Sequence, residues 1–187
     1  TPKPSSAASD VYKRQPQIRD AETADLEAIT AIHNDAVLNT TAIWNEEAVT
    51  VEDRAAWLAE RTGRGYPVIV AVDETGVLGY ATFGDWRPHS GYRHTVEHSV
   101  YVRDGQRGRG IGKALMIELI HRARSLGKHV MVAAIESSNT GSIIMHKRLD
   151  FMQVGRMPQV GTKFDRWLDL TFLQLVLDQR PFPDETK

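Results

Sequence analysis

Residues 100–113 read VYVRDGQRGRGIGK, an apolar strand joined to a helix by glycines that alternate with cations. Glycine lets the backbone approach an anion and turn its N–H groups toward it, and a helix beginning near Gly110 adds the positive end of its dipole. Arg107, Arg109 and Lys113 add full positive charges. The pattern is typical of a site for a bound diphosphate.

The sequence does not match the motifs of two better-known phosphate-binding loops. A Walker loop, GxxxxGK[ST], needs glycine where the chain has Arg107 and a hydroxyl where it has Ala114. A dinucleotide fingerprint, GxGxxG, needs glycine in place of Lys113. What remains is Arg107-x-x-Gly110-x-Gly112, which a solvated glycine-rich turn also satisfies.

The flanking residues favour a binding loop over a plain turn. An apolar strand, 96–102, precedes the glycines, and an amphipathic helix, 114–120, follows them. Strand, loop and helix together resemble the acyl-CoA pyrophosphate loop, [QR]-x-x-G-x-[GA], of the GNAT N-acetyltransferase superfamily. The resemblance implies acetyl-CoA as co-substrate.

Bulk composition indicates one globular domain. The chain has 187 residues, 41% of them hydrophobic, and a formal net charge of −1, which does not favour nucleic acid or a membrane surface as partner. It has no cysteine, which excludes a covalent acyl-cysteine intermediate and fits the cytoplasm best. We expect a single domain over 16–178, with 1–15 a disordered or cloning-derived leader and 179–187 a tail.

Periodicity predicts the order of elements along that domain. Between two N-terminal helices lies a polar stretch, 39–47, that contains Trp44 and is long enough to be a substrate-side loop. Thr50 and Asp53 form a capping box for the second helix. The predicted elements are a strand near Ile18, helices 23–37 and 50–63, a hairpin of 68–72 and 77–83, strand 97–102, a helix to 126, strand 130–135, a helix 140–149, and strands 152–156 and 167–177.

This order predicts an α/β (α+β) fold, with a mixed sheet and helices on both of its faces. It matches the GNAT fold, which implies a mostly antiparallel central sheet. The resemblance also implies that the fourth and fifth strands splay apart to admit the pantetheine arm of the cofactor.

Glu97 is the candidate general base for amide formation from an amine and a thioester. It precedes the glycine loop by one strand length and points to the face opposite His98 and Val100. His94-x-x-Glu97-His98 also spells the inverted zinc-protease motif. In a strand, however, the two histidines would lie roughly 13 Å apart, too far to share one zinc, so we expect no metal.

A wider set of motifs resembles the phosphinothricin and methionine sulfoximine acetyltransferase branch of the superfamily, from about Ile18 to Asp178. These motifs are TVEHSVYV at 95–102, Arg87-Pro88, AIES at 134–137 and MPQVG at 157–161. The resemblance implies that Glu97 is the base and that His146 assists. It implies acetyl-CoA contacts at Val100, Tyr101, Val102, Arg107, Gly108, Arg109, Gly110, Ile111, Gly112, Lys113 and Asn139.

The resemblance places the acceptor against Arg87, Pro88, His89, Glu97, His98 and Ser99. Trp86 to Arg93 is rich in cationic and aromatic residues, which suits an amino acid with a polar or anionic side chain. Two positions depart from the branch. His89 replaces an aromatic residue, and Asp150 stands where glycine is usual, which a left-handed backbone would make costly by roughly 1 kcal/mol.

The sequence predicts an enzyme that acetylates the α-amine of a small L-amino acid, such as methionine sulfoximine, methionine sulfone or phosphinothricin, by direct attack in a ternary complex. The alternatives are a protein N-terminus or lysine as acceptor, or a non-catalytic acyl-CoA-binding regulator. The segments 86–93 and 157–166 suit closure over something small. The branch implies a homodimer, for which Phe164, Trp167 and Leu168 are candidate contacts.

Overall fold

The computed structural model describes residues 16–183, so the predicted leader, 1–15, lies outside the described residues. The strands are β1 Gln17–Asp20, β2 Val68–Asp73, β3 Gly76–Asp85, β4 Thr95–Val102, β5 Val130–Glu136, β6 Met152–Lys163 and β7 Arg166–Val176. The helices are α2 Leu26–Asn39, α3 Val51–Gly63, α4 Ile111–Ser125 and α5 Thr140–Lys147, with 3₁₀ turns at Thr23–Asp25 and Ser90–Tyr92.

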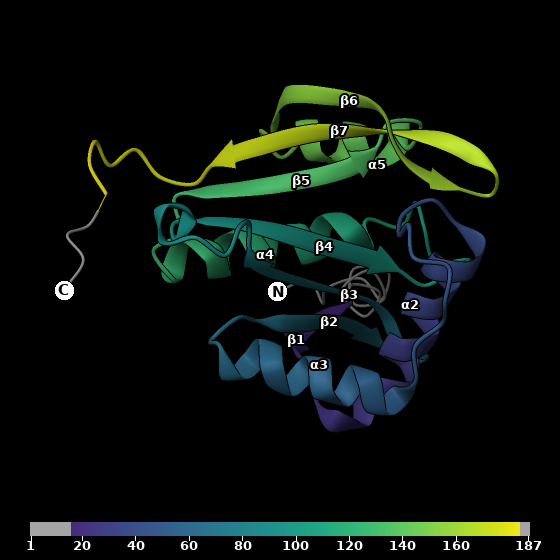
Figure 1. Cartoon of the computed structure of the whole chain (residues 1–187). Helices are drawn as coiled ribbons and strands as arrows, with labels where there is room; N and C mark the ends of the chain where they lie inside the picture. The colour runs from purple at the N-terminus through teal and green to yellow at the C-terminus, as the bar shows by residue number, and fades with distance from the viewer. Residues whose placement is uncertain (1–15, 184–187) are drawn as a thin grey trace, which may run out of the picture.

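All of these strands form one sheet in the order β1-β2-β3-β4-β5-β7-β6 (Figure 1). Neighbouring strands are antiparallel except β4 and β5, which run parallel. Parallel neighbours need a crossover connection, and α4 supplies it. The predicted class, a mixed and mostly antiparallel sheet in a GNAT-type order, is confirmed.

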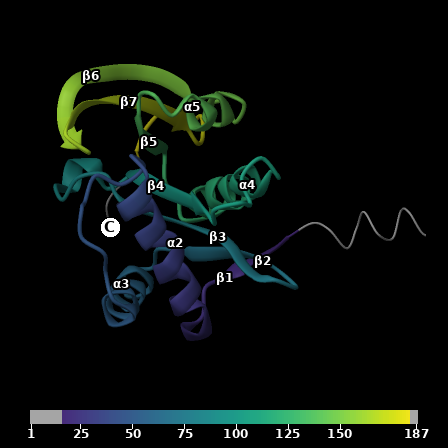
Figure 2. The same ribbon diagram turned by 90° about the vertical axis from the view of Figure 1, so that its right-hand side faces the viewer.

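Helices cover both faces of the sheet. Figure 2 shows α2 and α3 on one side of the strands and α4 on the other. Leu115 and Leu119 of α4 are fully buried in the larger apolar core. Ile29 and Ile32 of α2 pack with Tyr80 of β3 in a smaller cluster on the opposite face.

The side chains of β4 alternate between these two faces. Val100 and Val102 pack against the core that α4 helps to form, whereas Tyr101 packs against the α2 cluster. Because successive strand residues point to opposite faces, Glu97 shares the α2 face with Tyr101, and His98 lies on the α4 face.

The parallel pair β4 and β5 is hydrogen-bonded over only three residues of each strand. Thr95 to Glu97 pair with Val130 to Val132, and beyond them the strands separate. β5 continues along β7, but within residues 16–183 the edge of β4 beyond Glu97 that faces β5 has no strand partner. The expected splay of the fourth and fifth strands is confirmed.

The predicted start and end signals of the helices hold. Thr50 and Asp53 exchange hydrogen bonds between side chain and backbone at the start of α3, which is the predicted capping box. Gly65 and Gly127 follow α3 and α4 with φ of 78° and 67°. Glycine adopts this left-handed backbone without strain, so both helices end where the sequence indicates.

The main difference from prediction is β6. The sequence indicates a strand that ends at Arg156, but β6 continues to Lys163. Its register against β7 shifts between Met157 and Gly161, and Gln159 adopts a φ of 52°. A bulge of this kind breaks the period of two by which a strand is recognised. Residues 157–163, part of the segment expected to close over a small acceptor, are therefore the second half of a long strand.

Asp150 has a φ of 66°, so its backbone is left-handed as the departure from glycine indicated. We predict that Asp150→Gly raises the free energy of unfolding by up to about 1 kcal/mol, because glycine carries no steric penalty there. Chemical denaturation measures the change. Asp150→Ala is the control and should destabilise the protein, so equal midpoints for the two variants would contradict the argument.

Candidate active site

The segment between β4 and α4 is shaped by glycines with positive φ. Gly105, Gly108 and Gly110 have φ of 73°, 78° and 79°, and Gly110 is the N-cap of α4. The first backbone hydrogen bond of the helix runs from Ala114 N to Gly110 O, so the amides of residues 111–113 have no acceptor within the helix. Three free amides at the positive end of a helix dipole form an anion site.

A cavity of about 900 Å³ opens where β4 and β5 separate. Val100, Tyr101 and Val102 all line it, although Tyr101 points to the opposite face of the sheet from its two neighbours. The cavity therefore passes around the unpaired edge of β4 and reaches both faces. One end is formed by the glycine-rich segment and α5, and the other by α2 and residues 40–42.

The predicted cofactor residues, with one exception, line this cavity. The exception is Arg109, which hydrogen-bonds Gln106 and lies 4.0 Å from the Asp73 carboxylate. Asn139 caps α5, because its Oδ1 accepts from Ser142 N at 3.2 Å, so only its amide N–H groups are left to donate. The predicted cofactor residues found in the cavity lining are Val100, Tyr101, Val102, Arg107, Gly108, Gly110, Ile111, Gly112, Lys113 and Asn139.

Several cavity residues were not predicted as site residues. The polar stretch noted between the first two helices does contribute, through residues 39–42. Glu136, at the end of β5, belongs to the AIES motif, and Phe164 and Arg166, at the turn between β6 and β7, belong to the segment expected to close over a small acceptor. Neither pattern marks them as site residues. Only the separation of β4 from β5 brings these distant segments together.

Glu97 lies on the α2 face of β4 and is half-buried. Burial raises the pKa of its carboxyl, and the positive charge of Arg87 acts in the opposite direction. Ser99 and Tyr101 follow on the same face, and Tyr101 lines the cavity. Glu97 itself lies outside the lining, further along the strand, so a molecule reaching it from the cavity would follow this face of β4.

His98 and His146 form a buried pair on the other face. Their Nε2 atoms lie 3.0 Å apart, and His146 Nδ1 lies 2.7 Å from the carbonyl oxygen of Ser142. A carbonyl only accepts, so His146 carries its proton on Nδ1, and His98 must donate from Nε2. His98 Nδ1 is then a buried acceptor without a partner. Burial lowers the pKa of both rings, so the pair is neutral near pH 7.

The pair meets the cavity through Ser142. Ser142 lines the cavity, and its Oγ lies 3.4 Å from His146 Nδ1. His146 itself is fully buried, with Phe151 packed edge-on at 5.1 Å between ring centroids. The structure thus brings together His98 and His146, predicted separately as an acceptor contact and a catalytic group, and places both behind the cavity wall.

Arg87, Pro88 and His89 lie in an exposed loop outside the cavity lining. The Arg87 guanidinium stacks over the Trp86 ring at 4.5 Å, and Trp86 contacts Phe172 of β7 edge-on. Among Arg87, Pro88 and His89, Arg87 is the one whose charge acts to lower the pKa of Glu97. Of the predicted acceptor residues on β4, Ser99 lies on the same face as Glu97, and His98 lies on the opposite face.

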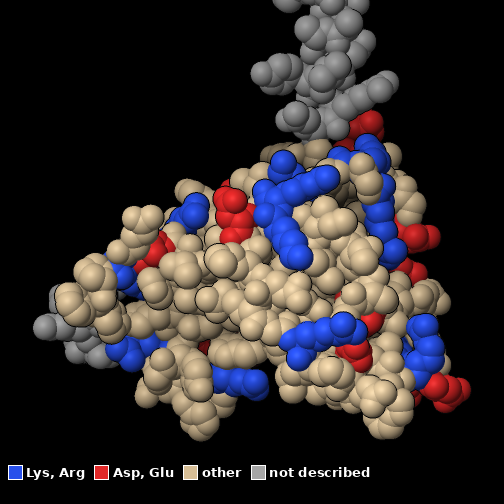
Figure 3. All heavy atoms as spheres, turned by 90° about the horizontal axis from the view of Figure 1, so that it is seen from above, with Lys and Arg blue, Asp and Glu red and all other residues tan. Residues whose placement is uncertain are grey.

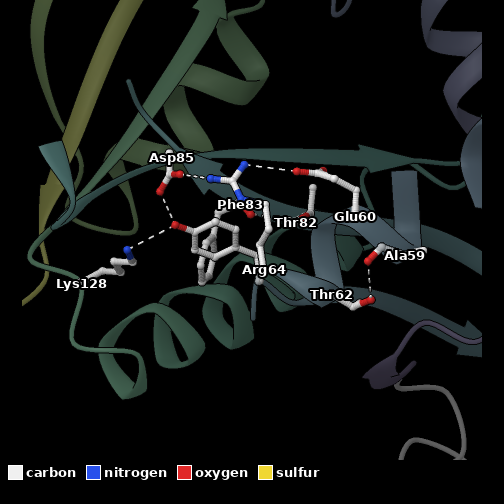
Figure 4. Close-up of polar contacts among 9 residues, drawn as sticks. Ala59, Glu60, Thr62, Arg64, Thr82, Phe83, Asp85 and Lys128 are labelled. Carbon is white, nitrogen blue, oxygen red and sulfur yellow. Dashed lines mark hydrogen bonds and ion pairs between the residues drawn. The ribbon is translucent and has the colours of Figure 1, made fainter. Parts of the chain in front are cut away.

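A polar network fixes the start of this loop. Asp85, the last residue of β3, accepts hydrogen bonds from Arg64 and from the Tyr66 hydroxyl (Figure 4). Lys128 lies 3.4 Å from the same hydroxyl and donates to the carbonyl oxygen of Arg93 at 2.7 Å. The network ties the end of α3 and the residues before β5 to both ends of the loop. Burial, together with the hydrogen bond to Asp85, raises the pKa of Tyr66 to about 12.

The zinc-motif residues do not converge. Thr95 begins β4, and Glu97 and His98 point to opposite faces of it. Among residues 16–183, no three His, Cys, Asp or Glu side chains are grouped to hold a metal ion.

Every helix among residues 16–183 is too short or too polar to span a bilayer. On the face seen from above, basic side chains stand in separate small groups amid uncharged surface (Figure 3).

A family model described as the acetyltransferase (GNAT) family matches residues 29–151, which is more than half of the chain. The chain belongs to this family. The family membership expected from the glycine-rich segment and its flanking elements is thereby confirmed.

Named relatives are similar over nearly the whole chain. The L-methionine sulfoximine/L-methionine sulfone acetyltransferase of Pseudomonas aeruginosa is 64% identical over 162 residues, covering 86% of this chain and 94% of that protein. The L-amino acid N-acyltransferase MnaT of Escherichia coli is 56% identical, covering 89% and 97%. The yncA protein of Salmonella typhimurium, solved with its cofactor acetyl-CoA, superposes with a TM-score of 0.90 at 53% identity, covering 92% and 100%.

The buried histidine pair predicts that the stability of the acetyltransferase falls in acid. Both histidine pKa values are lowered from 6.5 in the folded state, so the unfolded chain binds more protons below that pH. The stabilising contribution is complete above about pH 6.5 and is lost as pH falls toward the folded-state pKa values. We predict that His98→Gln, which keeps a donor to His146, weakens this dependence in denaturation measured between pH 7.5 and 5.5.

The matched control is His121→Gln, on the exposed side of α4. It should retain the pH dependence of the wild type. Identical pH profiles for His98→Gln and the wild type would show that the pair does not titrate as its contacts imply.

Proposed function

We propose that this acetyltransferase moves the acetyl group of acetyl-CoA to the α-amine of a small L-amino acid. L-Methionine sulfoximine and L-methionine sulfone are the first candidates, because the 64%-identical relative carries those names. Phosphinothricin, suggested by the sequence motifs, is a third. One observation carries the proposal: the strand that leads into the diphosphate-type segment also bears a half-buried carboxylate on the face that the cavity reaches.

The glycine-rich segment and the splayed strands suit acetyl-CoA. The free amides of residues 111–113 and the charge of Arg107 would bind the diphosphate. The backbone of Val100 and Val102 and the amide N–H groups of Asn139 line the path for the pantetheine arm. When bound, acetyl-CoA supplies an activated thioester.

Glu97 is proposed as the general base. Its carboxylate takes a proton from the acceptor ammonium, and the free amine attacks the thioester carbonyl carbon. A C–N bond forms as the C–S bond breaks, and the second proton lost by the attacking nitrogen passes to the departing sulfur, which leaves as a free thiol. The attack is direct, because the chain has no cysteine to carry the acyl group. His146 is proposed to assist through Ser142, the contact that links it to the cavity.

The setting proposed for the enzyme is the cytoplasm, which suits a chain without cysteine. A panel of free amino acids and peptides, each incubated with acetyl-CoA, tests the acceptor. Acetylation of methionine sulfone and sulfoximine supports the proposal. Acetylation of peptides alone, or acetyl-CoA binding without turnover of any amine, would replace it with a protein acetyltransferase or an acyl-CoA-binding regulator.

We predict that Glu97→Gln lowers kcat by roughly 10²- to 10⁴-fold, because the amide cannot accept the proton. The affinity for acetyl-CoA, measured by calorimetry, should not change. In the wild type, kcat/KM should fall as pH drops through the raised pKa of Glu97, so the acidic limb lies above its ordinary value of 4.5. Glu27→Gln, exposed on α2, is the control. An acidic limb that survives in Glu97→Gln would assign the base to another group.

We also propose that the enzyme forms a homodimer through β6 and β7. Among the residues suggested from sequence, Trp167 is 67% exposed and Phe164 46% exposed. Val160 of β6, next to the residue that pairs with Leu168, is 43% exposed. Leu168, in contrast, is buried and belongs to the core. Exposed apolar side chains of this size are typical of a surface that another protein covers.

Light scattering at working concentration tests the assembly. We predict a dimeric mass for the wild type and a shift toward the monomer for Trp167→Glu, because a charge in an apolar contact is costly to desolvate. A monomeric wild type would remove the proposed dimer.

A further inference from the structure

Lys163, at the end of β6, is the most unusual charged side chain in the described part of the protein. It is only 1% exposed, and its Nζ donates to the backbone carbonyls of Val37 and Ile43. Its charge also lies over the Phe164 ring at 5.0 Å. Burying an ammonium group costs desolvation free energy that an apolar side chain of the same length would not cost. We therefore look for the role of Lys163 in its two hydrogen bonds and not in its packing.

The two carbonyls connect the end of α2 to the loop that follows it. Val37 lies in the last turn of α2, where carbonyl groups lack a helical partner and carry the negative end of the dipole. Ile43 lies in the middle of residues 40–44, which we call the acceptor-side loop. Thr40, Thr41 and Ala42 of this loop line the cavity.

Two further contacts hold the same loop. The Trp44 ring packs against Gly161, where an added Cβ would overlap the ring, and its Nε1 donates to Thr41 O at 3.0 Å. Thr41 Oγ1 in turn donates to Glu136 at 3.2 Å. The loop is thus held between the end of β6 and the end of β5.

A tight turn between β6 and β7 follows Lys163 directly. Phe164 and Asp165 form a two-residue turn between the paired residues Lys163 and Arg166, and both have positive φ, 51° and 56°. Such turns usually use glycine or asparagine, so this one retains backbone strain. Phe164, within the turn, and Arg166, directly after it, both line the cavity.

We propose that Lys163 is a positioning residue for the acceptor: by holding the acceptor-side loop against the β6–β7 turn, it forms the cavity wall on the α2 face. This inference rests on the function proposed above. The glycine-rich segment and α5 occupy the other end of the cavity, where the acetyl-CoA contacts lie. The α2 end is left for the amine, on the same face of β4 as Glu97.

The test compares Lys163→Met with the wild type, using methionine sulfone as acceptor. We expect the acceptor KM to rise by roughly tenfold or more, because a loosened wall places the amine poorly, while the acetyl-CoA dissociation constant stays within about twofold. Lys163→Arg, which keeps the charge and donors, should lie closer to the wild type. Lys147→Met, exposed on α5 and outside the cavity lining, is the matched control.

Hydrogen–deuterium exchange of residues 38–47 gives a readout independent of turnover. Exchange there should be faster in Lys163→Met than in the wild type. If Lys163→Met does not fold, Gly161→Ala, which displaces Trp44 from the same wall, should give the same rise in acceptor KM. Wild-type acceptor KM and wild-type exchange in the Met variant, or equal kinetics for Met and Arg, would overturn the inference.

Failure of the proposed function is a separate outcome. In that case the wild type acetylates none of the amino acids, and the exchange experiment alone decides whether Lys163 holds the loop.

Discussion

The rest of the site depends on the separation of β4 from β5 after three paired residues. A sheet that stayed closed would pair the edge of β4 and leave no space beside it. Because the strands part, the cavity has polar backbone along one wall, the free amides of α4 at one end and the acceptor-side loop at the other. Through this single break in pairing, the consecutive elements β4 and α4 form one cavity with a loop some sixty residues earlier in the chain.

The two faces of β4 carry different ionisable groups. Glu97 lies on the α2 face with Tyr101, while His98 turns to the other face and is hydrogen-bonded to His146. Burial acts on the groups in opposite senses: it raises the pKa of the carboxyl and lowers the pKa of both imidazoles. In each case burial favours the uncharged form, which for the carboxyl makes a stronger base and for the histidines a neutral pair.

The sequence was sufficient to predict features that depend on the conformation of single residues and their near neighbours. The glycines of residues 105–110, the capping box at Thr50 and the left-handed backbone at Asp150 all follow from the conformational needs of single positions. It was insufficient where contacts join distant segments. A buried lysine that binds carbonyls 120 and 126 residues away has no local signature, and the bulge in β6 hides the strand that carries it.

The cavity reaches both faces of the sheet, and this has a kinetic consequence. Two molecules that arrive from opposite sides need not pass one another, so neither has to bind or depart first for geometric reasons. In the proposed reaction, the acylated amine can leave past α2 while the spent thiol carrier is still held at the glycine-rich segment. Release of the carrier, the larger of the two products, can then limit turnover.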